Sequence, residues 1–371
     1  MVNRLTHERV LSHDLSVSGT DAGPPDQKRG AETMTTLADV AAAAGVSKAA
    51  ASLVLSGKFE GRVSERKAER VRMAADELGY VRDAIAGGMR NGRTRTIGVI
   101  GERVLSTPYA VSMIDAVLSA SQSLGWSVLL TDAGHDGVAA KEAVREMVAR
   151  RVGQVVIASM YHRVVPVPEQ IKDVVVLNGV ADRPGVPGVV PDERQGASDA
   201  VAHLVDLGHR RIGYLGHDDA ESIAVRERSD SYRHSLREAG LAVDESLLVT
   251  GGLDPDSVDA TARRLLDRPD RPTAVFCYND ALAAGVFRQA VRLGISIPND
   301  LSVIGFDDLA LISTNLDPRL TTMRLPHWEM AEWLTRELAA GRTAELPDVT
   351  RFSCPLIERR AGGGPTSCAA P

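Results

Sequence analysis

The chain has 371 residues, of which 44% are hydrophobic and 25% are charged, a composition typical of soluble globular proteins. No apolar run approaches the roughly 20 residues that cross a bilayer, and residues 1–33 lack the apolar stretch of a secretory signal. The three cysteines are widely spaced, which argues against a disulfide framework. We therefore expect a cytoplasmic protein that makes no membrane contact.

The net charge of −6 is divided unevenly along the chain. Eleven basic residues stand against seven acidic residues between Met34 and Arg95, whereas residues 96–371 carry a net charge of −9. A small basic segment in front of an acidic body is typical of proteins that place only that segment on phosphate groups. A chance asymmetry of a solvated surface would give the same count, so motifs have to decide between the two interpretations.

Residues 1–33 are rich in Gly, Pro and charge and have no periodic apolar face, which predicts a disordered extension. Met34 directly precedes the first helical pattern, so a start of translation at Met34 and a genuine flexible tail are both open. The segment 34–81 then predicts three short helices, with Ser47 and Ser64 as N-caps of the second and third. Three helices with a tight turn at Gly45 form a helix-turn-helix unit.

Buried apolar strands alternate with amphipathic helices over residues 96–360, in two successive series. This pattern predicts parallel sheets with helices on both faces, arranged as two similar lobes with a cleft between them. The expected segments are an N-lobe of about 96–190 with a returning segment near 321–326, a C-lobe of about 191–320 with 327–360, and a disordered tail at 361–371.

The second helix of the helix-turn-helix unit has the residue types that suit a DNA groove. Ser47 and Lys48 lie at its start, where backbone N–H groups and the positive helix dipole favour phosphate. Ala49 and Ala50 are small enough to let the backbone approach, and Ala49 can contact a thymine methyl group, whereas Val54 is placed to pack inward. Ala-rich helix pairs also occur in proteins that never bind DNA, so this pattern alone leaves the function open.

Several collinear segments carry a resemblance to a known family. They are TLADVAAAAGVSKAAASLVLSG, RVSERKAERVRMAADELGY, GRTRTIGVI, LGHRRIGYLG, AVFCYNDALAAG, IPNDLSVIGFDD and LDPRLTTMRLP. Together they resemble the lactose repressor family (LacI/GalR type) over roughly residues 35–360. The resemblance implies an all-α helix-turn-helix head followed by a two-lobed α/β effector domain with parallel sheets, like that of periplasmic binding proteins.

The resemblance also implies which residues of the head contact DNA. It places base-reading roles on Lys48, Ala49 and Leu53. Its phosphate-contacting positions carry hydroxyl groups, which suit that role; they are Thr36, Ser47, Ser56 and Ser64. Leu53 departs from the arginine that is common there, and because leucine cannot donate a hydrogen bond to guanine, a different operator preference is expected. A core role for Leu53 is the alternative.

Within the predicted hinge and linker at 82–95, residues 82–90 resemble the family's hinge helix, in which two protomers press apolar side chains into the minor groove. The resemblance places Met89 at the wedge position, with Ala84 close to the groove and Arg90 at the end of the segment. Gly87 and Gly88 are departures, because each costs about 1 kcal/mol in a helix relative to alanine. We expect a hinge that folds only on DNA; a plain flexible linker is the alternative.

Parallel sheets in two lobes also occur in enzymes, but the chain lacks the common catalytic motifs. It has no GxGxxG after a strand, no phosphate loop, no GxSxG elbow and no HExxH pair. His203 and His209 have poor spacing for a shared metal and are interpreted as structural, and Cys277 is interpreted as inert core. We therefore expect a protein that is not an enzyme and that binds no cofactor and no metal.

Polar residues at the carboxyl ends of the predicted strands suit a ligand site in the cleft. Arg228 and Asp192 stand where the family places an effector-binding arginine and an acidic partner, and Leu253 replaces an aromatic residue that stacks on sugar in some relatives. The expected effector-binding residues are Tyr109, Asp192, Arg228, Leu253, Asn279 and Asp307. A carboxylate and a guanidinium grip hydroxyl groups well, so a sugar-like effector is expected; Asp280 is either a ligand contact or structural.

The resemblance implies a homodimer that represses transcription from a pseudo-palindromic operator in double-stranded DNA. Effector binding between the lobes is expected to change their orientation and to shift the hinge between folded and disordered states. Two other interpretations remain, a solute-binding protein with the same body and an α/β enzyme with a fused DNA-binding head.

Overall fold

The computed structural model describes residues 35–80, 94–102, 104, 110–133 and 137–365. The chain divides into two compact units, Met1–Asp83 and Ala84–Pro371, which we call the head and the body. The predicted disordered extension at 1–33 and nearly all of the predicted hinge at 82–95 lie outside the described residues.

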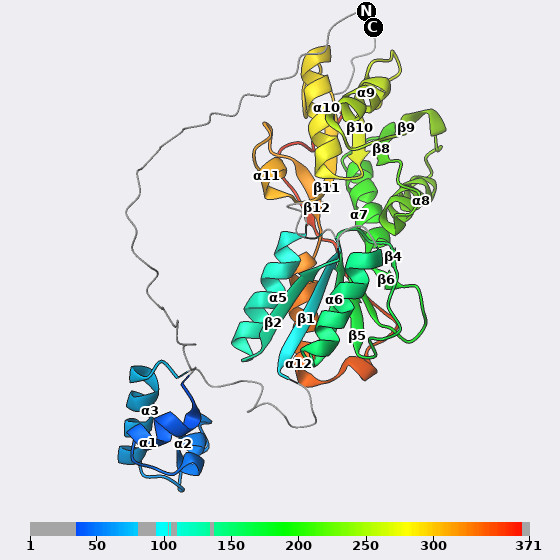
Figure 1. The fold of residues 1–371 in the computed structure, drawn as a ribbon. Helices are drawn as coiled ribbons and strands as arrows, with labels where there is room; N and C mark the ends of the chain where they lie inside the picture. The colour runs from blue at the N-terminus through cyan, green and yellow to red at the C-terminus, as the bar shows by residue number, and fades with distance from the viewer. Residues whose placement is uncertain (1–34, 81–93, 103, 105–109, 134–136, 366–371) are drawn as a thin grey trace, which may run out of the picture. The chain divides into compact units, whose positions relative to one another are not determined.

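The head is a three-helix unit whose helices are α1 (Leu37–Ala43), α2 (Lys48–Leu55) and α3 (Glu65–Glu77) (Figure 1). The predicted cap at Ser47 is present, since its hydroxyl accepts a hydrogen bond from the backbone N–H of Ala50. Thr36, which was not predicted as a cap, forms a capping box with Asp39. Gly45 has a φ of 62°, which allows the tight turn between α1 and α2. The side chains that form the head core are Val40, Ala41, Ala44, Ala51, Val54, Ala68, Val71, Ala74 and Ala75.

The body contains two six-stranded sheets, one in each lobe. In the N-lobe the strand order is β13-β7-β5-β3-β1-β2 and all pairings are parallel. These strands are β1 (Thr96–Glu102), β2 (Ser127–Asp132), β3 (Gln154–Ser159), β5 (Val174–Leu177), β7 (Gly188–Pro191) and β13 (Val349–Phe352). A short parallel pair, β4 (Val164–Val165) and β6 (Val180–Ala181), lies beside this sheet.

In the C-lobe the strand order is β14-β12-β11-β10-β8-β9, and only β14 is antiparallel. These strands are β8 (Ile212–His217), β9 (Leu248–Gly251), β10 (Ala274–Cys277), β11 (Ser302–Asp307), β12 (Thr321–Arg324) and β14 (Leu356–Ile357). The four-residue strands β10 and β12 are wholly or largely buried, as expected for strands covered on both faces.

Helices cover both sheets, as the alternating pattern predicts (Figure 1). The N-lobe carries α5 (Val111–Ser123), α6 (Gly137–Ala149) and α12 (His327–Ala340), with α5 packed along α12. The C-lobe carries α7 (Glu193–Asp206), α8 (Ile223–Glu238), α9 (Pro255–Leu266), α10 (Asp280–Leu293) and α11 (Ala310–Ser313). Two single 3₁₀ turns occur at Glu245–Leu247 and Thr343–Glu345.

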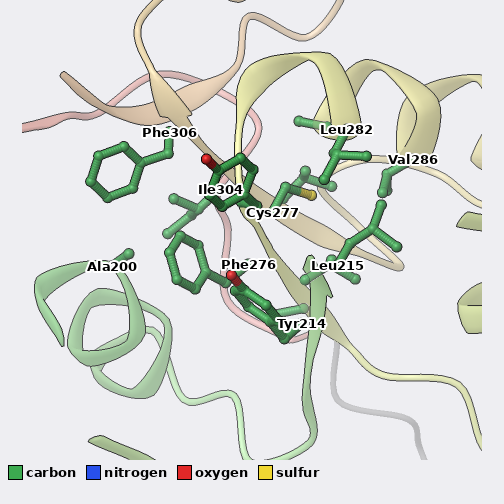
Figure 2. Close-up of a cluster of buried hydrophobic side chains, with 14 of the residues drawn as sticks. Ala200, Tyr214, Leu215, Phe276, Cys277, Leu282, Val286, Ile304 and Phe306 are labelled. Atoms are coloured by element: carbon green, nitrogen blue, oxygen red, sulfur yellow. The ribbon is translucent and has the colours of Figure 1, made fainter. Parts of the chain in front are cut away.

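The C-lobe core lies on both faces of its sheet (Figure 2). Phe276 and Phe306, whose ring centroids are 6.4 Å apart, lie on the side of α7, while Cys277 lies toward Leu282 of α10. Consecutive residues of β10 therefore face opposite helix layers, which is the period of two that a strand imposes. Because aromatics make up only 4% of the chain, most of the remaining core is Ala, Val and Leu.

The predicted division of the last third between the lobes is wrong. β12 at 321–324 pairs with β11 and belongs to the C-lobe, whereas α12 packs on α5 and β13 pairs with β7, so 327–352 belongs to the N-lobe. The chain crosses between lobes after residue 192, near 325 and near 354. Strand pairing is a long-range contact, and the alternation of apolar residues does not encode which sheet a strand joins.

The predicted disordered tail at 361–371 is also wrong for its first five residues. Ala361 is fully buried, and its carbonyl accepts a hydrogen bond from the backbone N–H of Val303 in β11. The Gly363 carbonyl accepts one from the hydroxyl of Ser302 at 2.6 Å. These backbone contacts attach the Gly-rich segment to the C-lobe sheet, which its composition does not reveal. Residues 366–371 lie outside the described part.

Within the described residues, no single helix has the length and apolar character to span a membrane. The pair α1 and α2 reaches that length and composition only when taken together, and the two helices are bent by 103° at their break.

Candidate DNA-binding face and interlobe pocket

The start of α2 presents an exposed polar and small-residue face. Ser47, Lys48 and Ala49 are exposed, whereas Ala51 and Val54 on the opposite side are buried in the head core. Val54 therefore packs inward as predicted. Leu53 is half-buried, one helical turn from Ala49. The N-terminus of α2 and one face with small side chains are therefore accessible to a binding partner. The opposite face of α2 packs in the head core.

The four predicted phosphate-contacting hydroxyl groups all lie at helix ends. Thr36 donates to Asp39 Oδ2 at 2.7 Å, and Ser56 donates to the Leu53 carbonyl at 3.0 Å. The hydroxyl of Ser47 is the acceptor of its capping bond, so its hydrogen is free to donate to a phosphate. Ser64 occupies the N-cap position of α3 without a side-chain capping bond.

The structure exposes five basic residues on α3 and in the loop before it that the sequence analysis did not name as DNA contacts. They are Lys58, Arg62, Arg66, Lys67 and Arg70. The excess of basic residues in this segment was the only indication of them in the sequence. Arg72 is engaged differently, since it pairs with Glu65 at 2.9 Å and lies over the ring of Phe59. The predicted hinge residues Ala84, Met89 and Arg90 lie outside the described residues.

A small pocket of about 50 Å³ lies between the two lobes. Its walls come from the segment after β3 in the N-lobe, from the ends of C-lobe strands and helices, and from the crossover near 325. The lining residues are Met160, Tyr161, His162, Asn178, Glu193, Ala224, Arg228, Leu253, Tyr278, Asn279, Asp307, Leu325 and His327.

A buried ion pair forms the centre of the pocket. Arg228 is 2% exposed, and its Nε lies 2.7 Å from Glu193 Oε2. Its Nη1 donates to the carbonyl of Tyr278 and lies 3.6 Å from Asp307 Oδ1, and its guanidinium stacks 3.6 Å from the ring centre of Phe306. Burial by itself would raise the pKa of Glu193, but Arg228 and the nearby His162 lower this pKa to about 2. Glu193 therefore stays ionised at neutral pH.

Asp307 has the opposite electrostatic environment. It ends β11 in a left-handed conformation with a φ of 109°, and its side chain is 11% exposed. Burial raises the pKa of this carboxyl well above its usual value, although Arg228 opposes the shift. An Asp307 that keeps its proton to a higher pH than a surface carboxylate can donate a hydrogen bond to a ligand hydroxyl group when protonated and accept one when ionised.

Four of the predicted effector residues line the pocket, namely Arg228, Leu253, Asn279 and Asp307. Arg228 lies in the second turn of α8, which begins at Ile223. Asn279 caps α10 by accepting from the backbone N–H of Leu282 at 2.9 Å. Tyr109 lies outside the described residues.

Asp192 does not line the pocket, so its predicted role needs correction. It is the N-cap of α7 and accepts from the backbone N–H of Gln195 at 3.1 Å. The next residue, Glu193, turns inward and makes the contact with Arg228. Asp280 is also structural: it accepts from the backbone N–H of Leu309 at 2.7 Å and from the hydroxyl of Thr322 at 2.6 Å.

Sequence reasoning missed the N-lobe wall of the pocket. The His162 carbonyl accepts from the backbone N–H groups of Ile223 and Ala224 at 2.8 and 3.4 Å, and its Nδ1 lies 3.5 Å from Glu193 Oε1. The Asn178 side chain donates to the carbonyls of Ser159 and Met160. Asn178 has a φ of 61° and precedes a glycine, so the Asn-Gly pair was the available signal for a turn at this edge.

Comparison with known proteins places this architecture. The family model described as "Bacterial regulatory proteins, lacI family" matches residues 36–83, and the model described as "Periplasmic binding protein-like domain" matches residues 201–361. The HTH-type transcriptional regulator GalR of Escherichia coli K12 is 32% identical over 337 residues, which cover 88% of this chain and 95% of GalR. The repressor CytR of the same strain is 32% identical and covers 81% of this chain and 87% of CytR. The chain belongs to the LacI family.

Solved structures agree with this assignment. A LacI-family transcriptional regulator from Rhizobium etli has a TM-score of 0.67 at 30% identity and covers 73% of this chain and 100% of that structure. A complex of the transcriptional regulator CelR with cellobiose has a TM-score of 0.61 at 28% identity and covers 88% of this chain and 100% of that structure. The lac repressor dimer bound to operator, at 24% identity, shares the fold with a TM-score of 0.72 over 90% of this chain and 100% of that structure.

This LacI-family protein is a DNA-binding transcriptional regulator, and its relatives are regulators rather than enzymes. The predicted fold class is confirmed, and the solute-binding and enzyme interpretations are not supported. The residues tested for chemistry have structural roles: His209 contacts Thr273, Ser302 and the Gly363 carbonyl, and Cys277 is fully buried with its thiol pKa raised by burial. No three His, Cys, Asp or Glu side chains of the described part are grouped to hold a metal.

Proposed function

We propose that this regulator is a homodimeric repressor that binds a pseudo-palindromic operator and senses a small sugar-like effector between its lobes. The observation that carries the proposal is the interlobe pocket in a chain that also has a helix-turn-helix head. A regulator with these two parts acts where the DNA is, in the cytoplasm, and needs neither a cofactor nor a metal.

For DNA binding, we propose that the start of α2 enters the major groove. Lys48 and Ala49 are exposed there, and we propose that they contact base edges. The exposed Ser47 beside them can donate a hydrogen bond to a phosphate. Leu53 offers only an apolar contact, which favours a thymine methyl group over guanine. The hinge residues Ala84, Met89 and Arg90 are proposed for the minor groove on the family resemblance alone.

For effector binding, we propose contacts from Arg228, Asn279 and Asp307, with Leu253 and Tyr109 as apolar neighbours. CelR was solved with cellobiose, which supports a carbohydrate-type ligand for a relative of this fold. The pocket of about 50 Å³ is much smaller than the roughly 300 Å³ at which ligand sites begin. We propose that the lobes separate to admit a sugar ring, which would couple binding to lobe orientation.

For assembly, we propose that a second copy covers the face formed by α5 and α11. Val111 and Leu118 of α5 are 52% and 46% exposed, and Leu311 of α11 is 69% exposed, although each is large and apolar. Leu118→Glu should convert the dimer to monomer in analytical ultracentrifugation. Val148→Glu on α6 changes an equally exposed valine and should leave the dimer intact; a Leu118→Glu dimer of unchanged affinity would contradict the proposal.

Operator selection from genomic fragments with the full chain, followed by titration at several salt concentrations, tests the DNA-binding part. Lys48→Ala should weaken operator binding and reduce the slope of log affinity against log salt by about 1, the loss of one phosphate or base-edge cation. Met73→Ala on the exposed face of α3 serves as the matched control. Equal affinity of Lys48→Ala and the unchanged protein for the selected operator would contradict the assignment of α2.

A further inference from the structure

Arg228 uses its Nε and Nη1 groups within the protein, whereas no described residue is bonded to its Nη2. Among the described residues that line the pocket it is the only arginine or lysine. Its Nε is taken by Glu193 at 2.7 Å, its Nη1 by the Tyr278 carbonyl and Asp307, and the rings of Phe306 and Tyr278 lie 3.6 and 4.6 Å from its guanidinium carbon. The positive charge of the pocket is therefore neutralised within the protein.

Helix N-termini are the second kind of group that binds anions, and at three of those around the pocket part of the N–H groups is bonded within the protein. In α8, Ile223 and Ala224 donate their backbone N–H groups to the His162 carbonyl. In α10, the Leu282 N–H donates to the Asn279 side chain, and in α7 the Gln195 N–H donates to Asp192. These three helix starts each use an acceptor of the chain itself, whereas α12, which begins at the pocket residue His327, has no side-chain cap.

We infer that Glu193 is a specificity-determining residue that holds Arg228 and excludes anionic ligands from the pocket. This inference rests on the proposed effector role of the pocket. The effector is then an uncharged or cationic compound rich in hydrogen-bond donors, such as an unphosphorylated sugar or an amino sugar, and not a sugar phosphate or sugar acid. An anionic ligand must either displace Glu193 from its buried pair with Arg228 or lie beside the Glu193 carboxylate. Either cost lowers the affinity of the pocket for the anion by about a hundredfold or more, relative to an uncharged ligand of the same shape.

Inorganic phosphate is a suitable probe, titrated into the full-length protein at an ionic strength held constant with chloride. Glu193→Gln keeps the size of the side chain and one oxygen for Arg228 but leaves the guanidinium charge uncompensated. Wild type should show no saturable binding by calorimetry and no rise in melting temperature. Glu193→Gln should bind phosphate at least about tenfold more tightly than wild type, because a buried unpaired cation recruits an anion.

Glu227→Gln is the matched control. Glu227 directly precedes Arg228 in α8 and is also mostly buried, but it pairs with the exposed Arg194 at 3.2 Å and does not line the pocket. This variant should respond to phosphate as wild type does. Asp307→Asn removes a negative charge from the pocket without freeing Arg228 from Glu193, so its gain in phosphate affinity should be smaller than that of Glu193→Gln.

Saturable phosphate binding by wild type that is lost in Arg228→Gln would overturn the inference. It would also be overturned if Glu193→Gln, folded by circular dichroism, bound phosphate no better than Glu227→Gln. Should Glu193→Gln fail to fold, the wild-type titration decides. These comparisons need no operator, so they are separate from the proposed function, which fails if no ligand of the pocket alters operator affinity.

Discussion

The carbonyl oxygen of His162 in the N-lobe accepts a hydrogen bond from the backbone N–H of Ile223, the first residue of α8 in the C-lobe, at 2.8 Å. A second bond from Ala224 and the approach of His162 Nδ1 to Glu193 make this one residue a bridge between the lobes. On the proposed effector role of this pocket of about 50 Å³, we expect ligand entry to break the bridge and so to change lobe orientation.

Removing the His162 side chain should make the bridge open more often. His162→Ala deletes the contact with Glu193 and leaves the backbone carbonyl less well fixed, so the amides of 222–225 should exchange faster with solvent. Hydrogen exchange measured by mass spectrometry over this segment tests the expectation. Val164→Ala, an exposed residue of the same segment, is the control. Unchanged exchange in His162→Ala would show that the bridge does not depend on the imidazole.

The Glu193–Arg228 pair should give a stability term with a defined pH window. The pKa of Glu193 is about 2 in the folded protein and near 4.5 when unfolded, so the stabilisation is complete above about pH 4.5 and is lost as pH falls toward 2. The difference in unfolding free energy between wild type and Glu193→Gln should shrink by about 3 kcal/mol over this range. Urea unfolding at a series of pH values measures it; a difference independent of pH would contradict the pair.

Asp280 should produce the opposite dependence at higher pH. Burial raises the pKa of Asp280 to about 7, although the Thr322 hydroxyl and the Leu309 N–H oppose the shift. Since this value exceeds that of the unfolded chain, stability is complete below about pH 4 and is lost as pH rises through 7, by about 4 kcal/mol. Asp280→Asn should remove this loss in urea unfolding. If wild type and Asp280→Asn lost stability in parallel between pH 4 and 7, the assignment to Asp280 would be wrong.

Two hydroxyl groups of the head should separate folding from DNA contact. Thr36→Ala removes a capping box and should lower both head stability, by about 1 kcal/mol, and operator affinity. Ser64→Ala removes a hydroxyl without a capping bond and should lower operator affinity alone. Thermal unfolding and operator titration of both variants test this contrast. Equal loss of head stability in the two variants would show that Ser64 is a structural cap.

The sequence predicted local features better than long-range ones. The N-cap positions at Ser47 and Ser64 were predicted correctly because a cap depends on a few adjacent residues. The family resemblance pointed to Asp192, but Asp192 is the N-cap of α7, and its neighbour Glu193 is the residue that contacts Arg228. A shift of one residue at a helix start changes which side chain faces inward, and helix starts are uncertain by that much.

The assignment of strands to lobes was less predictable. β12 and β13 are both four-residue strands, and only their partners β11 and β7 determine that they belong to different lobes. The N-lobe wall of the pocket was missed for a related reason. His162 acts through its backbone carbonyl, and no side-chain pattern identifies a carbonyl that accepts from a distant helix.

The most direct test of the central claim is operator affinity measured with and without a neutral sugar or amino sugar that raises the melting temperature of the full chain. We predict that such a compound changes operator affinity in wild type. Without the compound, Asp307→Asn should bind the operator with the affinity of wild type. With the compound, the operator affinity of Asp307→Asn should not change. An unchanged operator affinity in wild type, or a full response in Asp307→Asn, would contradict control from the interlobe pocket.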